Sequence, residues 1–215
     1  MENFNILEMM KVLPAVILGL TVHEYAHAYT AYKLGDSTAK DMGRMTFNPV
    51  KHIDPLGFFF ILIAGFGWAK PVIINPDNLK NKHRDEIWIS VAGPLSNLIL
   101  GIALFVLARL LFSLNIFTSN LQREGIIQWI LLGGVLNFGL FIFNLIPIPP
   151  LDGSHIYLTY LKKKNEKMFQ YIYKYGSFAL FGIIIFENQS KIQILPISSL
   201  IHFISNFFFD ILQFK

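Results

Sequence analysis

The sequence contains no cysteine among its 215 residues. A disulfide framework is therefore excluded, and so is any metal site built on thiolates. A metal ion bound by this chain would need imidazole and carboxylate ligands. Six histidines and 14 acidic residues are present to supply them.

Charged residues are also scarce. Only 15% of the residues are Asp, Glu, Lys or Arg, whereas 53% are hydrophobic, and an ordinary soluble domain carries about 25% charged residues. This composition indicates a membrane protein. The net charge of +4 does not call for a nucleic-acid partner, because positive charge in a membrane protein gathers in cytoplasmic loops.

Long apolar runs dominate the sequence. Four of them can cross the hydrocarbon layer, which is about 30 Å thick: residues 6–34, 87–112, 126–146 and 192–212. A fifth run, 168–186, is shorter, and 56–68 is brief and interrupted by glycines, so we predict that 56–68 is re-entrant or interfacial. The sequence thus predicts an all-α polytopic membrane protein with about five transmembrane helices. Residues 38–50 and 69–74 could add a small β-sheet at the membrane surface.

Basic residues predict the orientation of the chain. Thirteen of the 18 lysines and arginines lie in two stretches, 33–86 and 162–174. Basic loops stay on the cytoplasmic side, so we expect a multi-pass protein of the cell (plasma) membrane with its N-terminus outside. The first run has no small-residue cleavage site after it, and we expect it to be a retained helix that ends at Gly35.

The first run contains the motif His23-Glu24-Tyr25-Ala26-His27. Residues four apart share one face of a helix, so both imidazoles can reach one cation and Glu24 can take a proton from a water there. The alternative is a pair of histidines satisfied within a bundle. Ionisable groups inside a membrane helix are costly and usually functional, and we therefore predict a metal site.

A hydrolytic metal site needs a third protein ligand and one open position. Asp152 is the candidate, because the prolines of 147–150 break the helix before it and let a carboxylate turn inwards. The alternative is that Asp152 caps a helix starting at Gly153. If 56–68 does not cross the membrane, His27 and Asp152 reach the same cytoplasmic face. Because Asp152 then lies on the same side as the H-E-x-x-H motif, we predict that it is a metal ligand and not a cap.

Together these motifs resemble the site-2 protease family of intramembrane zinc metalloproteases, in its small bacterial form without PDZ or CBS domains. The H-E-x-x-H motif is followed about 125 residues later by Asn144-Leu-Ile-Pro-Ile-Pro-Pro-Leu-Asp-Gly153. Two further matches are Gly67-Trp-Ala-Lys-Pro-Val72 and Ala92-Gly-Pro-Leu-Ser-Asn97. The resemblance covers most of residues 22–155.

The resemblance implies one Zn²⁺ per chain, bound by His23, His27 and Asp152, with Glu24 as general base. It implies a single metalloprotease domain over residues 1–215, with a catalytic core at about 6–160 and C-terminal helices at about 168–212. It also implies an active-site role for Asn144, whose amide could bind the substrate or an oxyanion. The alternative for Asn144 is an interhelical hydrogen bond.

The implied substrate is a transmembrane helix of another protein or a signal-peptide remnant in the lipid bilayer. Such a helix hides its peptide bonds in its own hydrogen bonds, so the enzyme must unwind it and supply replacement partners. We predict that residues 147–151, including Pro150, and an edge at 69–74 bind it as an added strand.

Other polar residues receive structural interpretations. His155 stands where the family more often has arginine, so a fourth ligand is conceivable, but we favour a histidine at the membrane surface. His52, Asp54 and Asn97 are interpreted as structural. The rival functions are a metal transporter or sensor, in which Glu24 would have no separate duty, and an inactive relative that only binds helices.

Overall fold

The structure is a computed structural model that describes residues 6–64, 67–114, 119–190 and 192–212. Helices dominate these ranges, and the predicted all-α class is confirmed. The α-helices are α1 (Ile6–Leu34), α2 (Thr38–Asp41), α3 (Pro55–Ala64), α4 (Lys82–Leu114), α5 (Asn120–Asn144), α6 (Asp152–Lys164), α7 (Glu166–Ser190) and α8 (Ile197–Ile211). Two short 3-10 helices, η1 (Pro49–Lys51) and η2 (Pro76–Asn78), lie between them.

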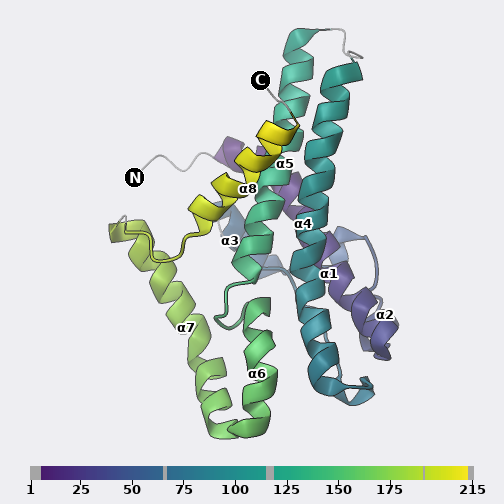
Figure 1. Ribbon diagram of the computed structural model, residues 1–215, viewed down its shortest axis with the longest axis vertical. Helices are drawn as coiled ribbons and strands as arrows, with labels where there is room; N and C mark the ends of the chain where they lie inside the picture. The colour runs from purple at the N-terminus through teal and green to yellow at the C-terminus, as the bar shows by residue number, and fades with distance from the viewer. Residues whose placement is uncertain (1–5, 65–66, 115–118, 191, 213–215) are drawn as a thin grey trace.

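The long helices α4 and α5 pack side by side, and α1 contacts both of them (Figure 1). Helix α8 packs on α5, while α6 and α7 form a hairpin whose first arm also contacts α4. Because α4 touches both α1 and α6, it brings the start of α6 towards α1. This arrangement determines where the site forms.

Small residues let α4 and α5 approach closely. A Cβ added at Gly101 of α4 would lie 2.5 Å from the Phe138 ring, and one at Gly134 of α5 would lie 2.5 Å from the Phe105 ring. Both phenylalanines are fully buried, with ring centroids 5.3 Å apart. A glycine of each helix thus packs against a phenylalanine ring of the other, as expected for helices that associate in lipid.

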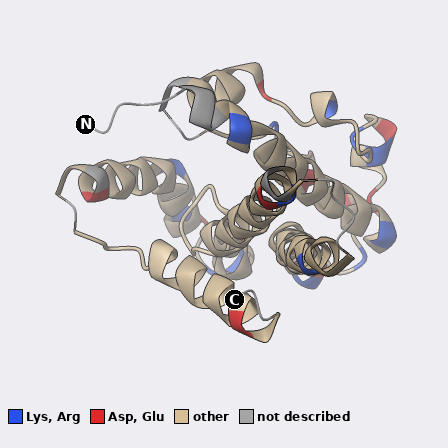
Figure 2. Cartoon of the chain, turned by 90° about the horizontal axis from the view of Figure 1, so that it is seen from above, with Lys and Arg blue, Asp and Glu red and all other residues tan. Residues whose placement is uncertain are grey.

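Three helices are long and apolar enough to cross a membrane: Lys82–Leu114, Gln122–Asn144 and Glu166–Glu187. They correspond to three of the predicted runs. Few residues along the described helices are Lys, Arg, Asp or Glu (Figure 2). Helix α1 has the predicted bounds, 6–34, and its membrane crossing stays a prediction.

The predicted span 192–212 is not confirmed. Helix α8 begins only after Pro196 and has 15 residues, about 22 Å at 1.5 Å per residue, which is shorter than the hydrocarbon layer. Proline lacks an N–H and fits the start of a helix better than its interior. Helix α3 has 10 residues, so the described part of 56–68 is also too short to cross, as expected.

The predicted surface sheet is reduced, within the described part of 38–74, to one isolated bridge between Ile53 and Ala69. The Lys70 N–H donates to the His52 carbonyl at 2.8 Å. Beyond this point Pro71 offers no donor, and the Arg44 guanidinium donates to the carbonyls of Lys70 and Pro71. A side chain therefore occupies the acceptors that a neighbouring strand would have used.

Helix α1 ends at Gly35, as predicted from the sequence. Gly35 has φ +114°, a left-handed conformation that glycine adopts without steric cost. The Asp36 N–H donates to the Ala31 carbonyl at 2.9 Å and the Gly35 N–H to the Tyr32 carbonyl at 3.2 Å. This is the Schellman pattern, which satisfies the last carbonyls of the helix.

Asp36 then anchors the end of α1 to the loop around η2. It is fully buried, and its carboxylate accepts hydrogen bonds from the Thr38 N–H and hydroxyl at 3.1 and 2.5 Å. It also accepts from the Asn75 N–H and the Asn78 amide, both at 2.8 Å. Burial works to raise the pKa of Asp36, but these hydrogen bonds hold the pKa below its ordinary value.

Asp36→Ala should lower the free energy of unfolding by about 2–4 kcal/mol, because it leaves several donors unpaired in a buried site. Since the folded-state pKa is depressed, the contribution is complete above the ordinary aspartate pKa of about 3.9 and is lost as the pH falls through the folded-state value. Denaturant unfolding in detergent micelles at pH 7 and pH 3 measures both effects. Asp77→Ala is the control, because exposed Asp77 pairs with exposed Lys82 and its loss should change little.

Candidate metal centre

The first part of the site lies on α1. His23, Glu24 and His27 are all buried, with exposed fractions of 5%, 7% and 7%. The two histidines are one helical turn apart and their rings are in edge contact, with centroids 4.6 Å apart. One face of α1 thus presents two imidazoles and a carboxylate inside the bundle, as the motif predicts.

The second part comes from the start of α6. The chain leaves α5 at Asn144 and turns through residues 145–151 before α6 begins at Asp152. A Cβ added at Gly153 would lie 2.2 Å from the Leu145 carbonyl oxygen, so glycine permits the tight return of the chain. Leu151 is the N-cap residue and there is no side-chain cap hydrogen bond. The structure therefore does not use Asp152 as a cap.

The two parts meet at one point. The Nε2 atoms of His23 and His27 are 3.0 Å apart. Asp152 Oδ2 lies 3.0 Å from the former and 3.3 Å from the latter. Among the residues that the structure describes, these three form the group of potential metal ligands whose donor atoms converge.

Hydrogen bonds on the far side of each ring define which nitrogen is free. His27 Nδ1 lies 2.7 Å from the Ile89 carbonyl oxygen of α4, which can only accept, so Nδ1 carries the proton and Nε2 has its lone pair free. His23 Nδ1 lies 2.7 Å from Asn97 Oδ1, also on α4. Both Nε2 lone pairs therefore face the carboxylate oxygen.

These three atoms fit a metal ion. A tetrahedral zinc ion with bonds of about 2.0–2.1 Å separates its ligands by about 3.3 Å, close to the distances within the trio. Two nitrogen lone pairs and a carboxylate oxygen repel one another unless a cation lies between them. In the described part of the chain, buried Asp152 Oδ2 receives no hydrogen bond, as expected of a ligand atom.

Gly93 of α4 completes the space around the imidazoles. A Cβ at this position would lie 2.3 Å from His27 Nε2 and 2.7 Å from His23 Cε1. Such contacts are shorter than van der Waals distance, so only glycine lets α4 pack this closely on the two rings. The sequence reasoning placed Gly93 in a family-like motif but gave it no role.

Glu24 is held by the backbone of a distant segment. Its Oε2 accepts a hydrogen bond from the Val72 N–H at 2.9 Å. Val72 belongs to the segment 69–74, which runs on from the bridge between Ile53 and Ala69. This segment therefore reaches the carboxylate beside the candidate metal ligands.

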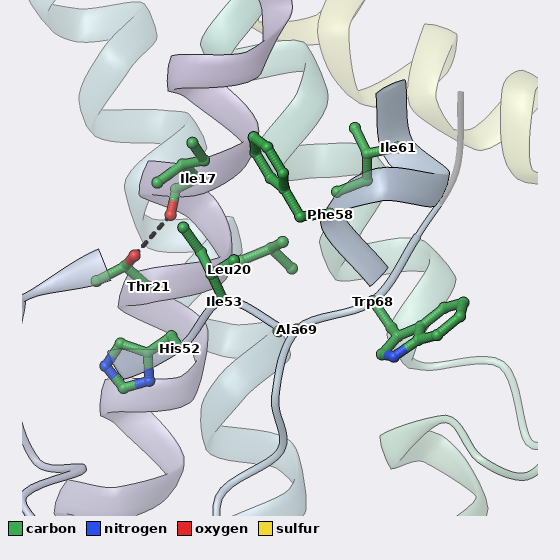
Figure 3. Close-up of a pocket in the computed structure, with 9 residues that line it drawn as sticks. All are labelled: Ile17, Leu20, Thr21, His52, Ile53, Phe58, Ile61, Trp68 and Ala69. Carbon is green, nitrogen blue, oxygen red and sulfur yellow. Dashed lines mark hydrogen bonds between the residues drawn. The ribbon is translucent and has the colours of Figure 1, made fainter. Parts of the chain in front are cut away.

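A small apolar pocket lies on the same side of α1 (Figure 3). Leu20 is one of its walls and lies four residues before Glu24, so pocket and carboxylate share a face of the helix. The lining residues are Ile17, Leu20, Thr21, His52, Ile53, Phe58, Ile61, Trp68 and Ala69. The pocket thus lies between α1, α3 and the segment 69–74.

Other predicted residues do not belong to the described trio. The Asn144 amide donates to the Leu140 carbonyl of its own helix at 3.0 Å, and Pro150 is exposed. His52 Nε2 donates to the Thr46 carbonyl at 2.7 Å. His155 is not part of the described group of converging ligands, and burial lowers its pKa below the ordinary value.

Sequence reasoning missed Asn137 of α5. It is fully buried, and its Oδ1 accepts from the Asn97 amide at 2.9 Å. An available signal was its position, since a polar side chain within an apolar run of a membrane helix requires a partner. Asn97, interpreted as structural, contacts a metal-ligand candidate directly.

Comparison with known proteins gives the family. A model of peptidase family M50 matches residues 12–122 and 111–184. "Putative zinc metalloprotease YwhC" of Bacillus subtilis is 46% identical over 141 residues, which are 66% of this chain and 64% of that protein. "Putative zinc metalloprotease MJ0611" of Methanocaldococcus jannaschii is 32% identical over 157 residues, 72% of each chain.

A third relative is "Putative zinc metalloprotease Rip2" of Mycolicibacterium smegmatis, 29% identical over 163 residues, which are 73% of this chain and 59% of that protein. The chain thus spans less than two thirds of the length of YwhC and Rip2. No solved structure matches it. The family match covers the α1 motif and Asp152 alike, and the chain therefore belongs to peptidase family M50, the family of the site-2 proteases.

Proposed function

We propose that this chain is an intramembrane zinc metalloprotease that hydrolyses peptide bonds in or near transmembrane helices of membrane-protein substrates. The observation that carries the proposal is the convergence of His23, His27 and Asp152 within 3.3 Å of one another, with Glu24 on the same helical face. Three helices are apolar and long enough to cross a membrane, and one of them, α4, packs against both imidazoles. The names of the relatives support zinc and proteolysis.

The roles of the residues follow from the donor set. His23, His27 and Asp152 would hold one zinc ion per chain. When bound, the ion polarises a carbonyl and acidifies water. Glu24 accepts the proton of the attacking water and returns it to the leaving amine. Its hydrogen bond with the Val72 N–H keeps one carboxylate oxygen fixed while the other remains available.

The substrate helix must be unwound before its peptide bonds can react. The segment 69–74 supports binding of an extended substrate because it already runs beside Glu24. The useful edge is shorter than we expected, since Arg44 donates to two of the segment's carbonyls. The substrate strand would therefore pair beyond Pro71, with Pro150 and Asn144 contacting it from the α5–α6 turn. The pocket of Figure 3 would accept an apolar side chain near the cleaved bond.

Orientation and location belong to the same proposal. The two basic stretches, 33–86 and 162–174, support a site that opens towards the cytoplasm. The proposed location is the cell membrane, where the bilayer supplies single-pass proteins or signal-peptide remnants as substrates. Zinc transport is the alternative function, but it does not explain why the Glu24 carboxylate is held next to the ligands.

Reversible metal removal tests the proposal. The purified full chain in liposomes should cleave a reporter that has one transmembrane helix. A zinc chelator should lower the rate at least about 100-fold, and added zinc, but not magnesium, should restore it, because imidazole ligands favour zinc. Zinc flux into the liposomes without reporter cleavage would support a transporter, and bound zinc with neither activity would support an inactive relative.

A further inference from the structure

The mechanism proposed above makes no use of a pair of asparagines buried between three helices. Asn97 of α4 and Asn137 of α5 are both fully buried in the bundle. Unpaired amides are costly at such sites, so each must have partners. Those partners lead directly to His23.

The hydrogen bonds of Asn97 determine its orientation. Its Nδ2 donates to the Gly19 carbonyl of α1 at 3.0 Å and to Asn137 Oδ1 at 2.9 Å. A backbone carbonyl can only accept, so the NH2 group must face Gly19 and the Oδ1 must face His23 Nδ1, 2.7 Å away. His23 Nδ1 then carries the proton.

Asn137 is fixed in the same way. Its Nδ2 donates to the Gly133 carbonyl of its own helix at 2.8 Å, so its Oδ1 is the atom that faces Asn97. The hydrogen bonds therefore run in one direction, from His23 to Asn97, from Asn97 to Asn137, and from Asn137 to the backbone of α5. Reversing either amide would place two acceptors or two donors against each other.

Close packing holds this chain of hydrogen bonds in place. Gly19 lies one turn before His23 on α1, and a Cβ there would lie 2.9 Å from Asn137 Oδ1 and 2.7 Å from Leu140 Cδ1. Glycine thus lets α5 approach the turn of α1 that carries His23. The two amides join three helices at one level of the bundle.

We propose that Asn97 and Asn137 are positioning residues, which hold His23 in the tautomer protonated at Nδ1 and aim its Nε2 at the metal. The inference rests on the proposed zinc site. Partners behind a ligand histidine determine its tautomer and ring orientation. Asn97 acts on the ring directly, whereas Asn137 acts only by holding Asn97.

The test measures zinc affinity of the folded full chain in detergent by competition with a zinc indicator. Asn97→Ala should weaken binding about 10–100-fold, the usual cost of losing such a partner. Asn97→Asp keeps an oxygen that accepts from Nδ1 but loses the NH2 group that donates to the Gly19 carbonyl and to Asn137 Oδ1, so it should recover only part of the affinity that Asn97→Ala loses. Thr159→Val is the matched control, since the hydroxyl of buried Thr159 on α6 donates to the His155 carbonyl of its own helix, and the change should alter affinity less than about twofold.

Asn137→Leu should give a smaller loss than Asn97→Ala. The double variant should be no weaker than Asn97→Ala alone, because Asn137 acts through Asn97. Additive losses, or an Asn97→Ala chain that binds zinc like the wild type, would overturn the proposal. If Asn97→Ala does not fold, Asn97→Asp and Asn137→Leu still test it.

A second readout needs no zinc. Nitrogen-15 NMR of the zinc-free chain should show His23 protonated at Nδ1 in the wild type and a mixture of tautomers in Asn97→Ala. A mixture already present in the wild type would overturn the inference. This result is independent of catalysis, so a wild type that failed to bind zinc or cleave the reporter would count against the proposed function and not against the asparagine pair.

Discussion

Replacing Glu24 by glutamine should abolish reporter cleavage and leave zinc bound. The amide has the size of the carboxylate and keeps an oxygen that can accept from the Val72 N–H, so the surroundings of the site stay intact. The ligands His23, His27 and Asp152 are untouched. What disappears is the group that accepts a proton, and loss of a general base costs about 10²–10⁴ in rate.

The measurement pairs the cleavage rate in liposomes with the number of zinc ions per chain. Glu166→Gln is the control, because it makes the same chemical change at an exposed residue of α7 and should leave both quantities unchanged. Cleavage by Glu24→Gln at the wild-type rate would rule out the proposed mechanism. Loss of zinc from the variant would instead show that Glu24 belongs to the ligand set.

The group of candidate metal ligands could be predicted because each part of it has a local sequence pattern. Helical spacing places His23 and His27 on one face whatever the tertiary structure, and a proline-broken segment before Asp152 predicts a turn. Predicting that the two parts meet required only that both reach one side of the membrane, and no detail of the packing. The structure confirms the predicted helix end at Gly35 for the same reason, since the signal is local.

The surroundings of the ligands could not be predicted in this way. Whether Asn97 faces His23 or a neighbouring helix depends on the rotation of α4 about its axis, which packing determines and no motif records. The Val72 N–H carries no side-chain signal at all. The expected sheet is not confirmed, and Arg44, which lies within one of its two expected segments, donates to the carbonyls of Lys70 and Pro71. The expected last span is not confirmed either, since helix α8 begins only after Pro196.

Gly93→Ala should remove the metal site while changing the side chain by one methyl group. The new Cβ would lie 2.3 Å from His27 Nε2 and 2.6 Å from its Cε1, so the ring must move. His27 is held on its other side by the Ile89 carbonyl, and moving the ring breaks that hydrogen bond or turns Nε2 away from Asp152. Either change removes His27 Nε2 from the ligand set, and we expect zinc affinity to fall at least about 100-fold.

Gly182→Ala is the matched control for this prediction. Gly182 also lies inside an apolar helix long enough to cross a membrane, α7, but a Cβ there meets nothing within 4 Å, and alanine favours helix more than glycine does. That variant should bind zinc and cleave the reporter as the wild type does. Circular dichroism should show both variants equally helical, because the clash is local to two rings. Wild-type zinc affinity in Gly93→Ala would show that α4 does not lie against the imidazoles in the functional protein. It would then also contradict the hydrogen bonds that Asn97 and the Ile89 carbonyl make with those rings.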